Sequence, residues 1–241
     1  MNDMCKDLPF KPADILLPRD CDMSLWSVIA CDQYTSRPEY WQRVEERVGR
    51  APSTLRLILP ESCLEGPSVE TDIMEVNNTM RRYLRAGRFQ EYPEALIYVA
   101  RTLDNGKTRR GLVGAVDLEA YDYEPGSASP VRATEGTVMS RIPPRVAVRK
   151  NAPIELPHAM LLVDDPHRMI IEPLSVRTGE MEKLYDFDLM ERGGHIRGWL
   201  LTEELKVQTL QALNTWKDRA EQDLDGELFD LWDCYPSLAP A

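Results

Sequence analysis

The sequence predicts an α+β protein built on a mixed, mainly antiparallel sheet, with helices near the N-terminus and a long helix at the C-terminus. Two observations carry this prediction. Apolar runs at 95 to 103 and 108 to 117 flank Asp104-Asn105-Gly106, which is a strong signal for a β-hairpin. Apolar residues also recur at helical spacing in both terminal thirds of the chain. Strands joined by hairpins and flanked by helices indicate the α+β class.

The first helix is expected to begin at Ser36, where Ser-Arg-Pro-Glu has the pattern of a capping box, and to stop at Gly49. Alternating leucines at 55, 57 and 59 then predict a short strand. Helical spacing resumes from Val69 and continues to Gly87. The N-terminal third is therefore read as two helices with a strand between them.

Downstream of the hairpin, compact apolar runs at 156 to 163 and 169 to 174 predict a second antiparallel pair. The segments 183 to 189 and 195 to 201 are expected to pair in the same way across two glycines. Thr202 is a suitable N-cap for the final helix, which carries a regular apolar stripe.

Composition limits the classes of protein. The chain has 241 residues, 43% of them hydrophobic, and we expect it to fold as a single domain over 1 to 241. A net charge of -11 argues against nucleic acid as a partner. We find neither a signal peptide nor an apolar stretch that would span a membrane, so no membrane partner is expected. Five cysteines without a CxxC pair fit reduced thiols and a cytoplasmic location.

The segment 131 to 150, VRATEGTVMSRIPPRVAVRK, is the most basic stretch of this acidic chain. Four arginines and Lys150 surround the small turn Thr134-Glu135-Gly136-Thr137. Guanidinium groups match phosphate or carboxylate oxygens with two parallel donors, so a site for a small anion is one interpretation. The other is an ordinary solvated face paired with acidic residues, and this is the commoner outcome for a charge run.

Two carboxylate clusters leave alternatives open. Glu135 could act as a general base on a hydroxyl while Arg132 holds a phosphate, or it could simply pair with that arginine. Asp164 and Asp165, with His167 nearby, could hold a hard cation, but the same residues are typical of an exposed turn. The turn is the favoured interpretation.

Seven ordered segments carry a resemblance to a known family. They are CDQYTSRPEYW, APSTLRLILPE, RRGLVGAVDLEAYDYEPGS, RATEGTV, RIPPRVAVR, APIELPHAMLLVDDP and IIEPL. Together they resemble the domain of unknown function 1015 family of bacteria and archaea, from about Ile15 to Tyr235. Full-length members are similar to the ParB and sulfiredoxin-like group, some of whose relatives phosphorylate free serine with a nucleotide. The resemblance implies a phosphotransferase, either a kinase of serine or an enzyme that consumes phosphoserine.

Carried onto this chain, the resemblance implies that RATEGT forms the anion-holding loop and that Asp32 and Tyr34 line the same cleft. Glu135 is the implied catalytic residue. The implied phosphate- and substrate-binding residues are Arg132, Thr134, Gly136, Thr137, Arg141, Arg145, Asp32 and Tyr34. The implied cofactor is Mg²⁺ with ATP or ADP, and no site for a resident metal is expected.

The chain also departs from the family pattern. Full-length relatives carry a later Asp-Gly-His-His-Arg or Asp-Gly-Asn-His segment, whereas Asp225-Gly226 is followed here by Glu227. We therefore expect a chain that lacks the C-terminal part of the family and is impaired in activity. The alternatives are a non-catalytic small-anion-binding or regulatory module, and an incomplete domain with an exposed sheet edge. The expected partner is a small anionic metabolite or nucleotide, and the sequence leaves the oligomeric state open.

Overall fold

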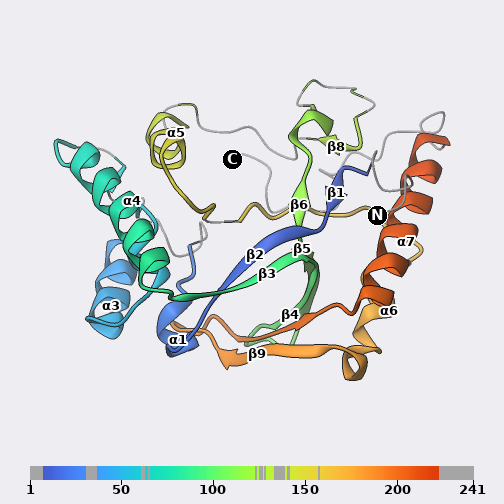
Figure 1. Ribbon diagram of the computed structural model, residues 1–241, viewed down its shortest axis with the longest axis horizontal. Coiled ribbons are helices and arrows are strands. Elements are labelled where there is room, and N and C mark those ends of the chain that lie inside the picture. The colour runs from blue at the N-terminus through green and yellow to red at the C-terminus, as the bar shows by residue number, and fades with distance from the viewer. Residues whose placement is uncertain are drawn as a thin grey trace.

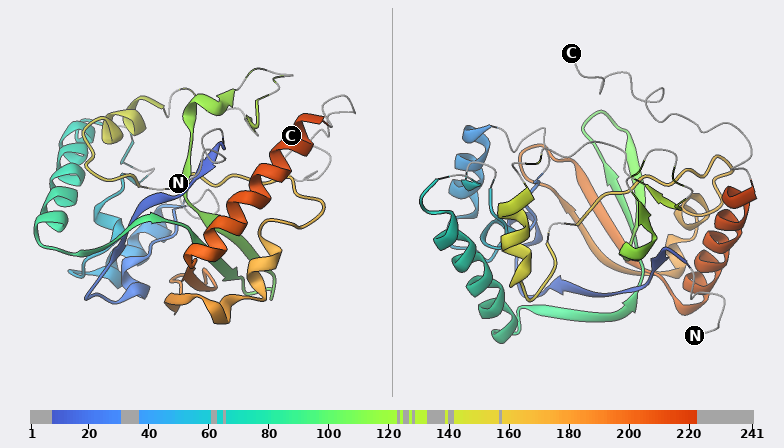
Figure 2. Two further views of the ribbon diagram at one scale, coloured as in Figure 1. Left: turned by 45° about the vertical axis from the view of Figure 1, so that its right-hand side comes forward. Right: turned by 90° about the horizontal axis from the view of Figure 1, so that it is seen from above.

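A computed structural model describes residues 8–30, 37–60, 63–64, 66–122, 124, 127, 129–132, 139, 142–156 and 158–222. Three helices gather at one end of the molecule, two helices lie at the other end, and a four-stranded sheet lies between them (Figures 1 and 2). The helices at the first end are α3 (Pro38–Val48), α4 (Val69–Arg85) and α5 (Ile142–Lys150). At the second end are α6 (Glu172–Ser175) and α7 (Glu203–Gln222). The predicted α+β class is confirmed.

The central sheet has the strand order β5-β4-β10-β9, and every neighbouring pair in it is antiparallel. Its strands are β4 (Ile97–Thr102), β5 (Thr108–Val113), β9 (Glu182–Asp188) and β10 (His195–Leu200). The turn between β4 and β5 places Gly106 at a φ of 79°, a backbone conformation that glycine adopts without steric cost. Both hairpins that the sequence predicts for these strands are confirmed.

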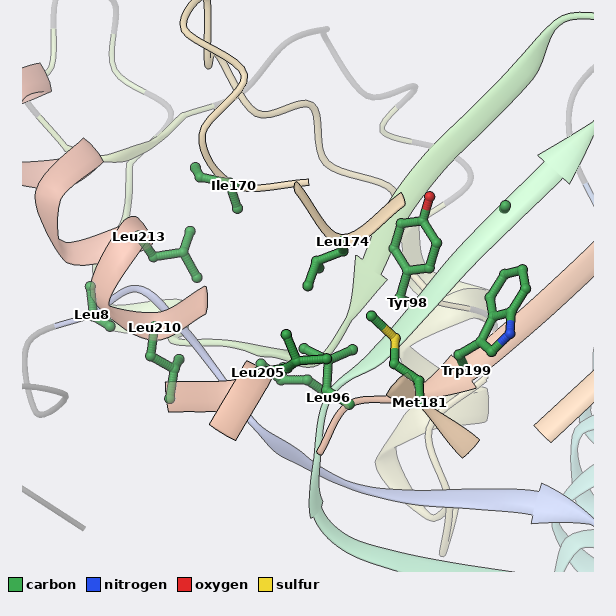
Figure 3. Packing of buried hydrophobic residues seen from close by; sticks show 12 residues of the cluster. Leu8, Leu96, Tyr98, Ile170, Leu174, Met181, Trp199, Leu205, Leu210 and Leu213 are labelled. Carbon is green, nitrogen blue, oxygen red and sulfur yellow. The ribbon is translucent and has the colours of Figure 1, made fainter. Parts of the chain in front are cut away.

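Each face of this sheet is covered by a different part of the chain. An antiparallel ribbon of β2 (Ala13–Pro18) and β3 (Phe89–Ala95) packs on one face, where Ile97 is buried against Ile15. The opposite face carries Tyr98 and Trp199 and is partly covered by α6 and α7 (Figure 3). The ribbon also links the helical end of the molecule to the sheet (Figure 1). The sequence reasoning did not predict this ribbon.

Short elements complete the described part of the chain. Strands β1 (Phe10–Lys11) and β6 (Ala115–Val116) pair antiparallel, and β7 (Tyr121–Asp122) and β8 (Val131–Arg132) pair parallel. Helix α1 is Met23–Trp26. The parallel pair forms a separate two-stranded sheet, so the four-stranded sheet itself is antiparallel throughout. No helix within the described ranges combines the length and the apolar character needed to cross a membrane.

The helical end is held by two clusters of buried side chains. Helix α3 contributes Val44, which is fully buried, and ends at Gly49 with a φ of 53°. Helix α4 contributes Met80, which packs with Trp26 and Leu57. The predicted helices are confirmed, although the proposed cap at Ser36 lies outside the described residues.

The predicted strand at Leu55 to Leu59 is wrong. Thr54–Arg56 form a single 3-10 turn, in which the Ser53 hydroxyl accepts a hydrogen bond of 3.2 Å from the Leu55 amide. Leu55 packs in the cluster of α3 and Leu57 in that of α4. The side chains of the alternating leucines are therefore buried in two different clusters, and they do not lie along one face of a sheet.

The predicted pairing of 156 to 163 with 169 to 174 is also wrong. The described residues of the first run form no strand, and Met160 to Val163 are exposed. Part of the second run lies in α6. The turn itself follows the favoured interpretation, because one carboxylate oxygen of Asp165 accepts hydrogen bonds from the amides of Met169 and Ile170 at 2.6 and 2.8 Å.

Candidate functional site

Only two of the candidate site residues lie in the described part of the chain. Arg132 ends β8 and Arg145 lies in the middle of α5, and both are exposed. Strand β8 pairs with β7, and α5 packs on α4, so the two elements stand apart in Figure 1. The remaining candidates lie outside the described residues, and their role stays a prediction: Asp32, Tyr34, Thr134, Glu135, Gly136, Thr137 and Arg141.

The second half of the predicted arginine segment folds as helix α5. Pro143 and Pro144 fall in its first turn, where a missing backbone N–H breaks no intrahelical hydrogen bond. Val148 is buried against the apolar side of α4. Arg145 and Arg149 lie three residues before and one residue after Val148, so they flank the buried contact, and both side chains are exposed. The basic residues of α5 therefore border its contact with α4.

Two polar contacts join α4 to α5. The side-chain amide of Asn77 donates to the carbonyl of Val148 at 3.2 Å in a buried position. Arg81 donates from Nη2 to the carbonyl of Asn151 at 2.8 Å, just beyond the last residue of α5. A cation at a helix C-terminus stabilises the carbonyls that lack an intrahelical partner. These contacts bring the end of α5 beside the basic half of α4.

Helix α4 supplies basic residues that the sequence reasoning missed. Its C-terminal half carries Arg81, Arg82 and Arg85, which with Asn78 and Ala86 line a shallow concavity of about 440 Å³. The signal was present in the sequence as RRYLRAGR, 81 to 88. Basic residues are common in the last turn of a helix, so such a run does not by itself indicate a site.

We call the cations on the surface of these two helices the α4–α5 basic face, which comprises the half-buried Arg81 and the exposed Arg82, Arg85, Arg145, Arg149 and Lys150. Some of them have local partners, since Arg82 lies 3.6 Å from Glu75 and Arg149 lies 2.8 Å from Glu155. For Arg85, Arg145 and Lys150 the described residues provide neither a hydrogen bond nor an ion pair. Uncompensated positive charge therefore remains on this face of an acidic chain.

The family model described as protein of unknown function (DUF1015) matches residues 9–219. The chain therefore belongs to this family. Neither a curated protein nor a solved structure matches it.

The α4–α5 basic face has the chemistry of an anion site. Among the residues that the structure describes, no three side chains of the metal-binding types converge on one point. Exposed guanidinium and ammonium groups instead provide donors for phosphate or carboxylate oxygens. What this face can do by itself is bind and orient a negatively charged group.

Proposed function

We propose that this protein binds a small phosphorylated metabolite at the α4–α5 basic face. The observation that carries the proposal is the uncompensated charge of Arg85, Arg145 and Lys150 on a chain of net charge -11. The adjacent concavity of about 440 Å³ falls in the size range of small-molecule sites. Negative charge elsewhere on the surface would favour the approach of an anion to this face over other faces.

We further propose phosphoryl transfer involving a small hydroxyl amino acid, serine or phosphoserine, as the activity that such binding serves. The support for this step is the resemblance to the ParB and sulfiredoxin-like group and the match of the RATEGT segment. In this scheme the α4–α5 basic face attracts the anion, whereas Arg132, which stands apart from α5, holds the phosphate during transfer and Glu135 takes the proton of the hydroxyl. Mg²⁺ would arrive with ATP or ADP, because its ligands in such sites are largely phosphate oxygens and water.

The alternative is a non-catalytic module that binds the same anion and regulates another process. The α4–α5 basic face favours this alternative, because its arginines and lysine can bind an anion without any chemical step. The two functions share the binding step and differ only in turnover.

Binding is tested by thermal shift with ATP, ADP, phosphoserine and serine, each with and without Mg²⁺. A ligand that binds the folded state raises Tm, and serine without phosphate should raise it least. The double variant Arg85→Ala/Arg145→Ala should weaken the best ligand roughly tenfold or more, because each arginine can give a charge-assisted hydrogen bond.

Arg47→Ala is the matched control. Like Arg85, Arg47 is an exposed arginine in the last turn of an amphipathic helix, so both changes alter a helix terminus in the same way. Equal affinity in the control and the double variant would exclude the α4–α5 basic face as the site.

Turnover is tested separately by following phosphoserine formation from serine and ATP, and the reverse reaction with ADP. Loss of turnover in Arg132→Ala and Glu135→Gln, with binding intact in Glu135→Gln, is the result expected of an enzyme. Binding without turnover would leave the regulatory module as the function.

A further inference from the structure

The face of the central sheet that carries Tyr98 also holds two arginines. Ala100 is the register partner of Arg110 on β5 and of Arg197 on β10. Residues directly opposite one another in antiparallel strands point to the same side of the sheet. Both arginines therefore flank the small side chain of Ala100, about 10 Å apart at the backbone, since they are two strand spacings from each other. Side chains of this length can reach the space above Ala100.

Aromatic rings form the floor next to these arginines. Tyr98 and Trp199 are register partners whose ring centroids lie 5.6 Å apart. The guanidinium carbon of Arg197 lies 5.6 Å from the centroid of the Trp199 ring, within the range of a cation–π interaction. Stacking on the ring holds the Arg197 side chain close to the sheet and restricts its position.

Two polar atoms in this region are buried without a partner. Tyr98 is only 1% exposed, yet among the residues that the structure describes none forms a hydrogen bond with its hydroxyl oxygen, and the same is true of Nε of Arg197. Figure 3 shows the Tyr98 hydroxyl pointing away from the leucines around Leu96 and Leu205. A buried polar group without a hydrogen bond costs free energy, so such groups usually serve a bound molecule or water.

The acidic residue opposite Arg197 in the sheet interacts with other basic side chains. Asp186 is the register partner of Arg197, but one of its oxygens lies 2.7 Å from Nε2 of His195 and the other 2.8 Å from Nζ of Lys183. Asp188 in turn lies 2.7 Å from Nδ1 of His195. In the described part of the chain, Arg110 and Arg197 therefore have no carboxylate within ion-pairing distance.

The electrostatic surroundings of the Tyr98 hydroxyl agree with this arrangement. Burial raises its pKa, whereas the charge of Arg110, the close approach of the Arg110 side chain and the charge of Arg197 lower it, and Glu172 of α6 adds a weaker raising effect. Arg110 approaches the hydroxyl without reaching hydrogen-bond geometry. The phenol oxygen thus lies among two guanidinium groups and one carboxylate.

We propose that Arg110, Arg197 and the Tyr98 hydroxyl form a second binding site, the sheet-face site, for the oxyanion group of a small metabolite. Two guanidinium groups neutralise the ligand, and the phenol donates the hydrogen bond that it lacks in the free protein. Carboxylate and phosphate share this chemistry, and the experiment separates them. The site uses β4, β5 and β10, so it does not depend on the α4–α5 basic face.

The test compares succinate, inorganic phosphate and sodium chloride at matched ionic strength, by thermal shift and by calorimetric titration of the full chain. Succinate or phosphate should raise Tm more than chloride does, and the better of the two identifies the source of the oxyanion. Tyr98→Phe should keep the Tm of the unliganded protein, because it removes a hydroxyl that has no partner. Its Kd for the probe should rise roughly tenfold, as expected for one lost hydrogen bond.

Arg110→Ala, compared with Arg109→Ala, provides the matched pair. Both residues are exposed and adjacent on β5, and they point to opposite faces of the sheet. Binding should weaken strongly in Arg110→Ala and little in Arg109→Ala. The double variant Arg85→Ala/Arg145→Ala should bind the probe at this site as the parent does, so its result separates this proposal from the proposed function. Equal binding by Tyr98→Phe, Arg110→Ala and the parent chain would overturn the sheet-face site, as would the absence of any effect beyond that of chloride.

Discussion

The two cationic regions of this protein differ in the number of their basic side chains and in the groups that surround them. The α4–α5 basic face has six cations, all on helix surfaces, and several of them reach a nearby carboxylate or carbonyl. The sheet-face site has only two arginines, but it adds a buried hydroxyl and an aromatic floor. Many exposed charges attract an anion over a long distance, whereas a few partly buried donors fix its position. The first region should govern attraction and the second selectivity.

The largest effects should come from removing the apolar side chain that supports each region. Trp199→Ala deletes a side chain that is 7% exposed and that underlies Arg197, so it should cost about 3–5 kcal/mol of unfolding free energy. Met80→Ala, in the fully buried support of α4, should cost about 2–5 kcal/mol. Chemical denaturation measures both losses.

The same pair of variants separates the two sites functionally. Under conditions where both proteins remain folded, Trp199→Ala should abolish binding of the probe at the sheet-face site, and Met80→Ala should preserve it. If Met80→Ala weakened that binding as much as Trp199→Ala does, the loss of binding would come from lower global stability. Trp199 would then have no specific role in the sheet-face site.

Salt should affect the two regions unequally. Between about 0.1 M and about 1 M salt the Debye length falls from about 10 Å to about 3 Å, which screens exposed charges more than buried ones. Phosphate affinity measured in Arg110→Ala, which retains the α4–α5 basic face, should fall more steeply with salt than affinity measured in Arg85→Ala/Arg145→Ala. Parallel salt dependences would show that the two sites are equally exposed.

The smallest effect should appear as a pH dependence beside the sheet-face site. Hydrogen bonds to Asp188 and Asp186 raise the pKa of His195 above its ordinary value of 6.5. A raised pKa in the folded state stabilises the fold fully below the unfolded value, and this contribution is lost as the pH rises through the folded value. The imidazolium is partly exposed, so we expect about 0.2–1 kcal/mol.

Chemical denaturation of the parent chain and of His195→Gln, at pH values from below 6.5 upward, measures how the stabilisation by His195 changes with pH. The advantage of the parent over the variant should be largest at the acidic end and should shrink as pH rises. An advantage that grew with pH would contradict the assignment of a charged His195 between the two aspartates.

The parts of the fold that sequence predicted correctly are those with strong local signals. Asp104-Asn105-Gly106 specifies its own turn, and the apolar stripes of α3 and α4 fix their buried sides. In α7 the predicted stripe is confirmed at Leu210 and Leu213, whereas Val207 is exposed. The strand predicted at Leu55 to Leu59 is wrong because alternating apolar residues show only that the side chains are buried. Here Leu55 and Leu57 are buried in two different clusters of the helical end. The β2–β3 ribbon was missed because its pairing joins distant segments and β3 contains Pro93.

The candidate site was predictable only in part. Sequence indicated the basic character of α5 through Arg145 and Arg149, but it could not show that Val148 would place these residues beside the arginines of α4. The sheet-face site had no sequence signal. Arg110 and Arg197 lie on different strands, and only the strand register brings both next to Ala100.

The central pairing of β4 with β10 has a consequence for how this protein is made. Ile97 pairs with Leu200 and Thr102 with His195, so the middle of the sheet joins the centre of the chain to a segment near its end. During synthesis the β4–β5 hairpin leaves the ribosome well before β10 does, and until then one edge of β4 has no strand to pair with. Such non-local pairing slows folding. We therefore expect the sheet to close late, and the nascent chain to be most prone to aggregation in that interval.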